Sequence, residues 1–204
     1  MTAPPRKAPR LLARAAQTAT AATAVADVFR ALELREHTVP HLVSQQDEPP
    51  QDSILGTQIF IWLMTLSAVL FLMWLARARR NALQLSPEAE VPTGGWVTWA
   101  WFVPLVNLFV PLQHVLAIGR ASSPVWDRKR DTTLVGLWWA GWVGHGLALT
   151  AVAQISPGSM TGLVVTEALM AAAAVLLILV IERITTLQSA ALDRPAPVPT
   201  LAEV

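Results

Sequence analysis

The chain has 204 residues, of which 53% are hydrophobic and only 14% are charged, and its mean hydropathy is +0.46. Ordinary soluble domains carry roughly 25% charged residues, so this composition favours a membrane protein, and the length favours one domain. The chain contains no cysteine, which excludes disulfides, thiolate catalysis and cysteine-ligated metal centres.

The two ends of the chain differ from its middle. Residues 1–9 and 191–204 are rich in Pro and Ala without periodicity, so we predict disordered tails around a membrane domain at 10–190. The basic start resembles that of a signal peptide. The stretch that follows is rich in Ala and Thr and contains Asp27 and Arg30, so we expect no cleavage.

The first hydrophobic stretch, residues 11–34, has the length of a membrane span but carries Arg14, Asp27, Arg30 and Glu33. A charge at the centre of a membrane helix costs about 2.5 to 3.5 kcal/mol. Asp27 and Arg30 are spaced i,i+3 and could form an ion pair. We predict a span here, with an amphipathic surface helix as the alternative.

Three further stretches, 54–76, 133–155 and 162–182, are predicted to span the membrane, because about 20 apolar helical residues cross a hydrocarbon core. The second contains His145 and the third contains Glu167. The segment 37–53 has three prolines and several acids, and we expect an irregular loop outside the membrane.

The stretch 96–118 is apolar but interrupted by Pro104 and Pro111, with Asn107 between them. Proline costs about 3 kcal/mol inside a helix, so we predict two short half-helices. Irregular backbone is tolerated at membrane depth only where protein covers it or where it lines a wet cavity.

Basic residues decide the topology. Most of them fall in four clusters, near the start of the chain, after 76, between 120 and 130, and near the end. All four clusters lie on one side if 96–118 enters and leaves on that side, as the positive-inside rule requires. We therefore predict an all-α integral membrane protein with four transmembrane helices, a proline-broken re-entrant or interfacial hairpin, and cytoplasmic N- and C-termini. Thirteen Arg against two Lys, with abundant Ala, is typical of a bacterium with a GC-rich genome, which makes the bacterial plasma membrane the expected location.

The cytoplasmic side would then carry a basic rim, expected to contact anionic lipid headgroups. The rim consists of Arg77, Arg79, Arg80, Arg128, Lys129 and Arg130.

The broken stretch also carries a resemblance. Its core contains Trp101, Phe102, Pro104, Asn107 and Pro111, and Trp138-Trp139 follow in the next helix. This pattern resembles the bacterial membrane-protein family called domain of unknown function 4328 (DUF 4328), over about 24–189, although Leu112 stands where the family usually has an aromatic residue. The resemblance implies a multi-span membrane protein and brings no activity or ligand.

Polar residues at membrane depth form the candidate site, because exposing an ionisable group to lipid is costly. They are Asn107, His114, His145, Glu167, Asp27 and Arg30. Asn107 could bind a ligand, but we favour a role in satisfying the backbone groups that the prolines free. Glu167 could serve a proton relay, but we favour a neutral, hydrogen-bonded carboxyl that fixes helix register. Direct pairing with His145 would need a tilt or a water.

A stripe of small residues follows one face of 133–155, namely Gly136, Ala140, Gly144 and Ala148. Small residues at this spacing allow close packing of membrane helices. We expect this stripe to pack within the chain, with homodimerisation as the alternative.

No nucleotide-binding or hydrolase motif occurs, and no metal site, cofactor or nucleic-acid surface is expected. We predict a non-enzymatic accessory or envelope-organising protein with an unknown membrane-protein partner. The alternatives are a small transporter or channel-like subunit that uses the broken helix and Glu167, and an intramembrane enzyme acting on a lipid-linked substrate.

Overall fold

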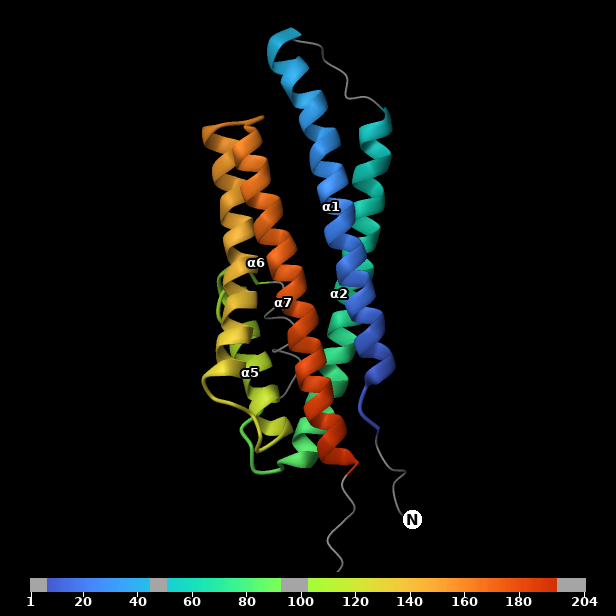
Figure 1. Ribbon diagram of the computed structural model, residues 1–204, viewed down its shortest axis with the longest axis vertical. Helices are drawn as coiled ribbons and strands as arrows, with labels where there is room; N and C mark the ends of the chain where they lie inside the picture. Colours follow the sequence, from blue (N-terminus) through green and yellow to red (C-terminus); the bar gives the residue numbers. More distant parts are fainter. Residues whose placement is uncertain (1–6, 45–50, 93–102, 194–204) are drawn as a thin grey trace, which may run out of the picture.

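The computed structural model describes residues 7–44, 51–92 and 103–193, and within these residues all regular structure is helical. In this described part of the chain, two short helices accompany four long ones, and the long ones run side by side (Figure 1). The long helices are α1 (Arg10–Ser44), α2 (Gln51–Leu85), α6 (Arg130–Ile155) and α7 (Met160–Leu192), and the short ones are α4 (Pro104–Asn107) and α5 (Val110–Ser122).

The long helices form two antiparallel hairpins, α1–α2 and α6–α7 (Figure 1). The hairpins meet mainly through contacts of α7 with α1 and α2, whereas the backbones of α2 and α6 do not come close in the described part of the chain. α5 packs against α2, α6 and α7, at the end of the bundle where α1 begins (Figure 1). Arg10 and Asp193 pair at 3.3 Å, so the described chain begins and ends at the same end. We call it the terminal end.

The turn between α6 and α7 explains the tightness of that hairpin. Gly158 has φ 79°, a left-handed conformation that glycine adopts without steric cost. Ser159 then caps α7, since its Oγ accepts from the backbone N–H of Gly162 at 3.2 Å. A serine cap of this kind satisfies one of the free donors at a helix start.

The core is thickest toward the terminal end. Trp74 of α2, Ile118 of α5 and Ile184 of α7 are fully buried there. Trp74 also donates from Nε1 to Thr185 Oγ1 at 3.0 Å, which satisfies the indole N–H in an apolar setting. This core holds α5 against the two hairpins.

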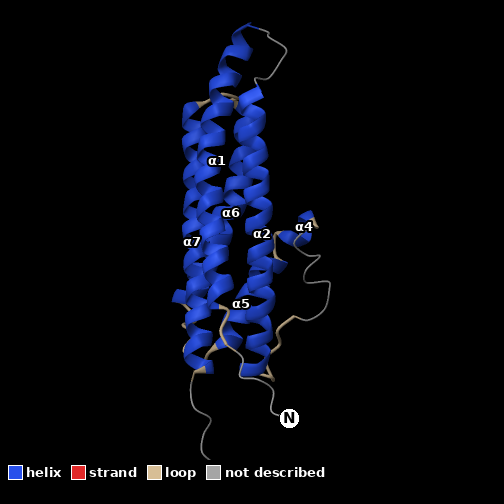
Figure 2. Cartoon of the chain, turned by 90° about the vertical axis from the view of Figure 1, so that its right-hand side faces the viewer, coloured by secondary structure: helices blue, strands red, loops and turns tan. Residues whose placement is uncertain are grey.

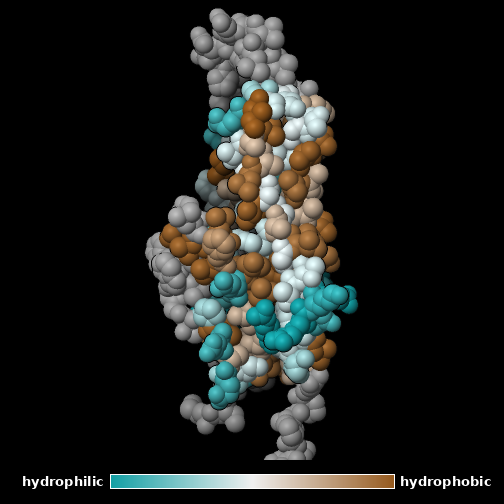
Figure 3. All heavy atoms as spheres, turned by 90° about the vertical axis from the view of Figure 1, so that its left-hand side faces the viewer, coloured by the Kyte–Doolittle hydropathy of each residue, from teal (hydrophilic) through white to brown (hydrophobic). Residues whose placement is uncertain are grey.

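The flanks of the bundle are strongly apolar. Large hydrophobic side chains such as Trp62, Leu147 and Ile155 are more than two-thirds exposed. Figure 3 shows hydrophobic patches along one flank and hydrophilic side chains gathered toward the terminal end. Two helical segments, Leu55–Leu85 and Met160–Leu192, are long and apolar enough to cross a membrane.

The predicted helix break is confirmed in the described residues. Pro104 is the first residue of α4 and Pro111 the second of α5, and the break lies at Leu108 and Phe109. Proline is tolerated at these positions because the first N–H groups of a helix have no partner in the helix. α4 lies on the outside of the bundle about halfway along it (Figure 2). Trp101 and Phe102 fall outside the described residues.

The predicted loop at 37–53 is wrong in part, because α1 continues through Pro40 to Ser44 and α2 begins at Gln51. α7 likewise reaches Leu192, two residues into the predicted tail. Extending a formed helix gains a hydrogen bond for each added residue, so the helices run past their apolar stretches. The remaining tail residues, 1–6 and 194–204, lie outside the described ranges.

Among the described residues, no helix covers Gly136, Ala140 and Gly144 of the small-residue stripe, contrary to our expectation. A Cβ atom added to Gly136 or Gly144 would meet nothing within 4 Å, and Ala140 is exposed. Gly141 faces α7 instead, where an added Cβ would lie 3.3 Å from the Cβ of Ala173. The next residue along a helix is rotated by about 100°, so α6 presents a neighbouring face to α7.

Candidate functional site

Four of the six candidate residues, two of them buried and two half-buried, gather in one group, which we call the charge cluster. It comprises Asp27 and Arg30 from α1, His145 from α6 and Glu167 from α7. Asp27 is 1% exposed and accepts two hydrogen bonds from Arg30, of which the one from Nε is 3.0 Å long. The Arg30 guanidinium also lies 4.6 Å from the centre of the Phe60 ring, a cation–π arrangement.

Glu167 is the exceptional member of this cluster. It is 8% exposed, and its Oε2 atom is fully buried without a hydrogen-bond partner among the described residues. It lies close enough to Asp27, His145 and Arg30 to interact electrostatically with all three. A buried carboxyl oxygen without a partner is costly, which marks Glu167 as the side chain in the cluster with capacity for a further contact.

His145 approaches Glu167 through its neighbour along the chain. His145 Nδ1 lies 3.0 Å from the backbone oxygen of Thr166. Since a carbonyl can only accept, Nδ1 carries a proton and donates. His145 therefore bonds the backbone of the residue before Glu167, and needs neither a water nor direct pairing with the Glu167 carboxyl group. This bond holds the imidazole ring against α7 beside Glu167.

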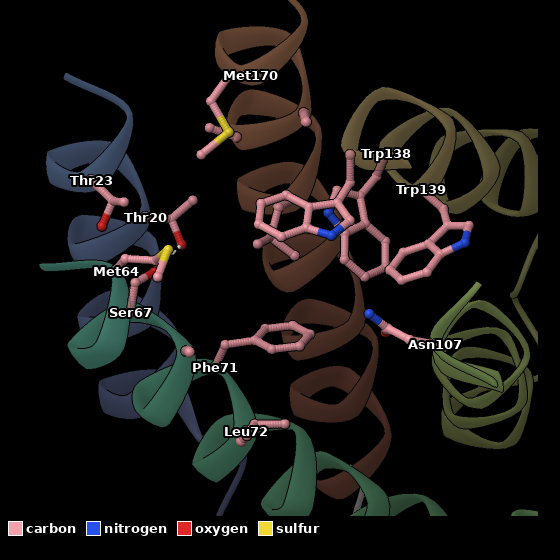
Figure 4. Close-up of a pocket in the computed structure, with 15 residues that line it drawn as sticks. Thr20, Thr23, Met64, Ser67, Phe71, Leu72, Asn107, Trp138, Trp139 and Met170 are labelled. Carbon is pink, nitrogen blue, oxygen red and sulfur yellow. Dashed lines mark hydrogen bonds between the residues drawn. The ribbon is translucent and has the colours of Figure 1, made fainter. Parts of the chain in front are cut away.

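A cavity of about 220 Å³ lies beside the charge cluster, toward the terminal end. Side chains of α1, α2, α4, α6 and α7 line it (Figure 4). They are Thr20, Thr23, Met64, Ser67, Ala68, Phe71, Leu72, Asn107, Trp138, Trp139, Trp142, Met170, Ala173, Ala174 and Leu177. Thr23 is one turn from Asp27 and Met170 one turn from Glu167 along their helices, so the cluster borders one end of the cavity.

The few polar groups of α1 and α2 in the cavity wall are already hydrogen-bonded. Thr20 Oγ1 donates to the Ala16 oxygen and Thr23 Oγ1 to the Ala19 oxygen, both at 2.8 Å. The hydroxyls of Thr20 and Ser67 lie 3.2 Å apart, a contact drawn in Figure 4. This wall is therefore effectively apolar toward a ligand.

Asn107 provides the polar group on the opposite side (Figure 4). Its Oδ1 atom is buried without a partner among the described residues. The carbonyl of Leu108, freed by the helix break, accepts instead from Trp139 Nε1 at 2.9 Å. Trp139 thus bonds the freed carbonyl, a role that we expected of Asn107. The Asn107 amide lines the cavity, with its nitrogen pointing toward Trp138 (Figure 4).

His114 lies apart from the charge cluster, toward the terminal end. It is 5% exposed and neither ring nitrogen has a partner among the described residues. Burial, and after it the charge of nearby Arg79, lower the pKa of His114 to about 4. The Nε atom of Arg79 is likewise buried without a described partner. α2 and α5 therefore enclose a pair of nitrogen-bearing groups with unused hydrogen-bonding capacity.

Polar contacts at the terminal end include residues that the sequence reasoning missed. Gln188, fully buried on α7, donates from Nε2 to the Ala78 oxygen at 2.7 Å and to Ser122 Oγ at 2.9 Å. Its Oε1 accepts from Asn81 at 3.2 Å. One signal for a buried Gln188 was present in the sequence, namely that it lies among small and apolar residues. These bonds hold the last turns of α2 beside α5 and α7. The basic rim residues on those turns therefore lie at the terminal end.

Comparison with known proteins gives one informative result. The profile described as Domain of unknown function (DUF4328) matches residues 52–186, which is more than half of the chain. The chain belongs to this family. No curated protein and no solved structure shows a significant match.

In this DUF4328 chain the family match includes Asn107, His145 and Glu167 but not Asp27 or Arg30 on α1. The charge cluster thus joins residues inside the matched range to residues outside it. Among the described residues, no group of three or more His, Asp or Glu side chains is arranged to hold a metal ion.

Proposed function

We propose that this DUF4328 protein crosses the bacterial plasma membrane four times, at 11–34, 54–76, 133–155 and 162–182. The α4–α5 segment is re-entrant, and both termini are cytoplasmic. The apolar flanks and the basic residues at the terminal end support this topology. So does the placement of α4, halfway along the bundle, with α5 returning toward the terminal end (Figure 2). The basic rim then meets anionic headgroups of the inner leaflet.

Cysteine labelling tests this topology, and the natural chain has no cysteine to interfere. Arg128→Cys lies in the exposed turn before α6, and Ser156→Cys lies at an exposed position in the α6–α7 turn. A membrane-impermeant maleimide added to intact spheroplasts is expected to label Ser156→Cys alone. Arg128→Cys should react only after the membrane is opened. Labelling of Arg128→Cys from outside would overturn the re-entrant assignment.

Within this topology we propose a non-enzymatic role, as an accessory or envelope-organising component that works with another membrane protein. The observation that carries it is the small-residue face of α6, which the described helices leave uncovered. A Cβ atom added to Gly136 or Gly144 would meet nothing within 4 Å, and Ala140 is exposed. Small residues at this spacing allow a helix of another membrane protein to pack closely.

Complementation of a deletion strain distinguishes an accessory role from an enzymatic or transport function. A strain lacking the gene would be complemented with Glu167→Gln and with Asn107→Ala, after each protein is shown to reach the membrane at the natural level. An accessory role predicts that both variants restore the envelope phenotype of the deletion strain. Loss of complementation by both folded variants would contradict it.

A second candidate, a small transporter or channel-like subunit, is favoured by the charge cluster. Buried ionisable groups in membrane proteins often mark ion or proton pathways, and Glu167 Oε2 has no described partner. Proton flux into proteoliposomes would test it, with Glu167→Gln as the variant and Glu182→Gln as a control at the terminal end. Flux abolished by the first change alone would favour transport, and unchanged flux would exclude it.

The lipid-linked enzyme receives no comparable support. It would need a cavity that brings Asp27, His145 and Glu167 to a substrate, and none of the three is among the residues that line the cavity.

A further inference from the structure

We propose that the cavity binds one hydrocarbon chain of an anionic glycerolipid, with Asn107 near the ester group and Arg79 and His114 near the phosphate. Lipid binding here presupposes the membrane topology proposed above, which cysteine labelling tests separately. Failure of lipid binding can therefore be told apart from failure of the topology.

The wall of the cavity matches a hydrocarbon chain. Apart from Asn107, its surface is made of three tryptophans, one phenylalanine, two methionines and aliphatic or small side chains, and the hydroxyls of Thr20 and Thr23 donate to backbone carbonyls of their own helix. An ordered water needs about two to four polar partners, and the Asn107 amide oxygen is the one buried and unpaired polar side-chain atom among the described residues of this wall. At about 220 Å³ it is smaller than the roughly 300 to 1,000 Å³ typical of drug-sized ligands, so it suits part of one chain.

The cavity opens toward the flank of the bundle. The backbones of α2 and α6 do not come close in the described residues. Their side chains Phe71 and Trp138 meet across the space between them, with ring centres 6.1 Å apart. Met64 and Trp142, one from each helix, line the cavity and are about 40% exposed. Since the flank faces the bilayer in the proposed topology, the molecules that reach this opening are lipids.

Asn107 supplies one polar contact in this apolar site. Its amide group lies at the cavity wall facing Trp138 (Figure 4), and its Oδ1 is buried and unpaired among the described residues. Binding pockets for apolar ligands commonly carry a few placed polar groups that fix ligand orientation. The Asn107 side-chain NH₂ can donate to an ester carbonyl.

The charge of the ligand follows from the neighbouring residues on α2. Arg79 follows the cavity residue Leu72 by seven positions, two turns on the same helix face and about 10 Å closer to the terminal end. Arg79 Nε and both ring nitrogens of His114 are buried without described partners. The Arg79 Nε–H group and the single N–H of the neutral His114 ring are unpaired donors beside a fixed positive charge, which is a combination that selects an anion. We expect a lipid whose chain enters the cavity to carry its phosphate toward this end.

Quenching of tryptophan fluorescence tests chain binding directly. Full-length protein in detergent would be titrated with phosphatidylglycerol that carries bromine on one acyl chain, because bromine quenches only indoles that it contacts. Saturable quenching at one lipid per protein is expected. Ala174→Leu, which fills the cavity from α7, should weaken binding at least tenfold. Ala171→Leu, the same change on an exposed face of α7, should leave binding within twofold.

Two further arms make the outcome decisive. If Ala174→Leu fails to fold, Ala68→Leu fills the cavity from its exposed edge and should also weaken binding. Equal quenching in the natural protein and in a folded cavity-filling variant would overturn the proposal.

For the headgroup, Arg79→Gln should abolish the preference for phosphatidylglycerol over brominated phosphatidylcholine and leave chain binding intact. Inorganic phosphate at millimolar concentration should not displace the lipid. Displacement would show that the nitrogens bind a free anion, and would overturn the assignment of a lipid.

Discussion

Arg183 of α7 donates two parallel hydrogen bonds to Asp131 of α6, from Nε to Oδ1 at 3.0 Å and from Nη2 to Oδ2 at 2.9 Å. Asp131 Oδ2 also accepts the backbone N–H of Asp127 at 2.9 Å. The Asp131 side chain is 2% exposed, whereas that of Arg183 is 33% exposed. Burial by itself would raise the pKa of Asp131, but the hydrogen bonds and the charges of Arg183 and Arg130 hold it below its ordinary value.

The first prediction concerns this pair. Asp131→Asn removes the charge and leaves Arg183 without its partner, so it should lower the free energy of unfolding by about 1 to 3 kcal/mol, a range reduced because Arg183 is partly exposed. Because the folded pKa of Asp131 is lower than the unfolded one, its contribution is present at neutral pH and is lost as the pH falls below about 4. Thermal unfolding in detergent should show the two proteins converging in acid. A constant difference across this range would contradict the assignment.

The second prediction concerns His114. Its folded pKa of about 4 lies below the ordinary value of about 6.5. The unfolded chain therefore binds more protons between these values, and stability should fall as the pH is lowered from 6.5 toward 4. His114→Phe should flatten this part of the profile, and Arg79→Gln should make it shallower. Melting curves between pH 4 and 8 measure both effects, and an unchanged slope in His114→Phe would show that another group titrates.

The third prediction concerns Gln188, which bonds α2 and α5 to α7. Gln188→Leu keeps the volume roughly constant but leaves Asn81 Nδ2 and the Ala78 oxygen without their bonds, which should cost about 2 to 4 kcal/mol. Gln84→Leu is the matched control. Gln84 is exposed on α2, at the same end of the bundle as Gln188, and its replacement should lower the free energy of unfolding by less than about 0.5 kcal/mol. Similar destabilisation by the two changes would mean that the buried bonds add nothing.

The fourth prediction compares glycines. A Cβ at Gly119 would lie 2.3 Å from two ring atoms of Trp126, so Gly119→Ala must displace the indole and should destabilise the protein by about 1 to 3 kcal/mol. A Cβ at Gly136 has open space, and Gly136→Ala should stabilise α6 by about 0.5 to 1 kcal/mol. Tryptophan fluorescence should change for the first variant only. Equal stability of the two would contradict the packing of Trp126 on Gly119.

Sequence reasoning located what depends on local chemistry. The prolines predicted the break before α5, the apolar runs predicted the long helices, and the basic clusters agree with their meeting at one end. What depends on helix rotation was not predictable. α7 is hydrophobic on nearly every side, so its sequence does not show that Glu167 and Gln188 face inward. For the same reason we predicted that the face of α6 with Ala140 packs against another helix. The face that packs against α7 contains the next residue, Gly141.

Hydrogen-bond and electrostatic partners on different helices could not be predicted from the sequence either. Trp139 and the Leu108 carbonyl are 31 residues apart, and Asp27 and Glu167 are farther still. No periodicity within a single helix encodes such pairs, because they depend on the tilt between the hairpins. The charge cluster and the cavity could therefore be seen only in the fold.

The position of Asp27 and Arg30 on one helix also has a consequence for biogenesis. Chains enter the membrane in order of synthesis, so α1 and α2 are made long before α7 reaches its place. The i,i+3 ion pair requires only α1 itself, and Phe60 of α2 covers the guanidinium next. Asp27 and Arg30 therefore neutralise each other before the second hairpin enters the bilayer. Glu167 arrives last, as the only acid of the cluster whose electrostatic partners lie on other helices that are already in place.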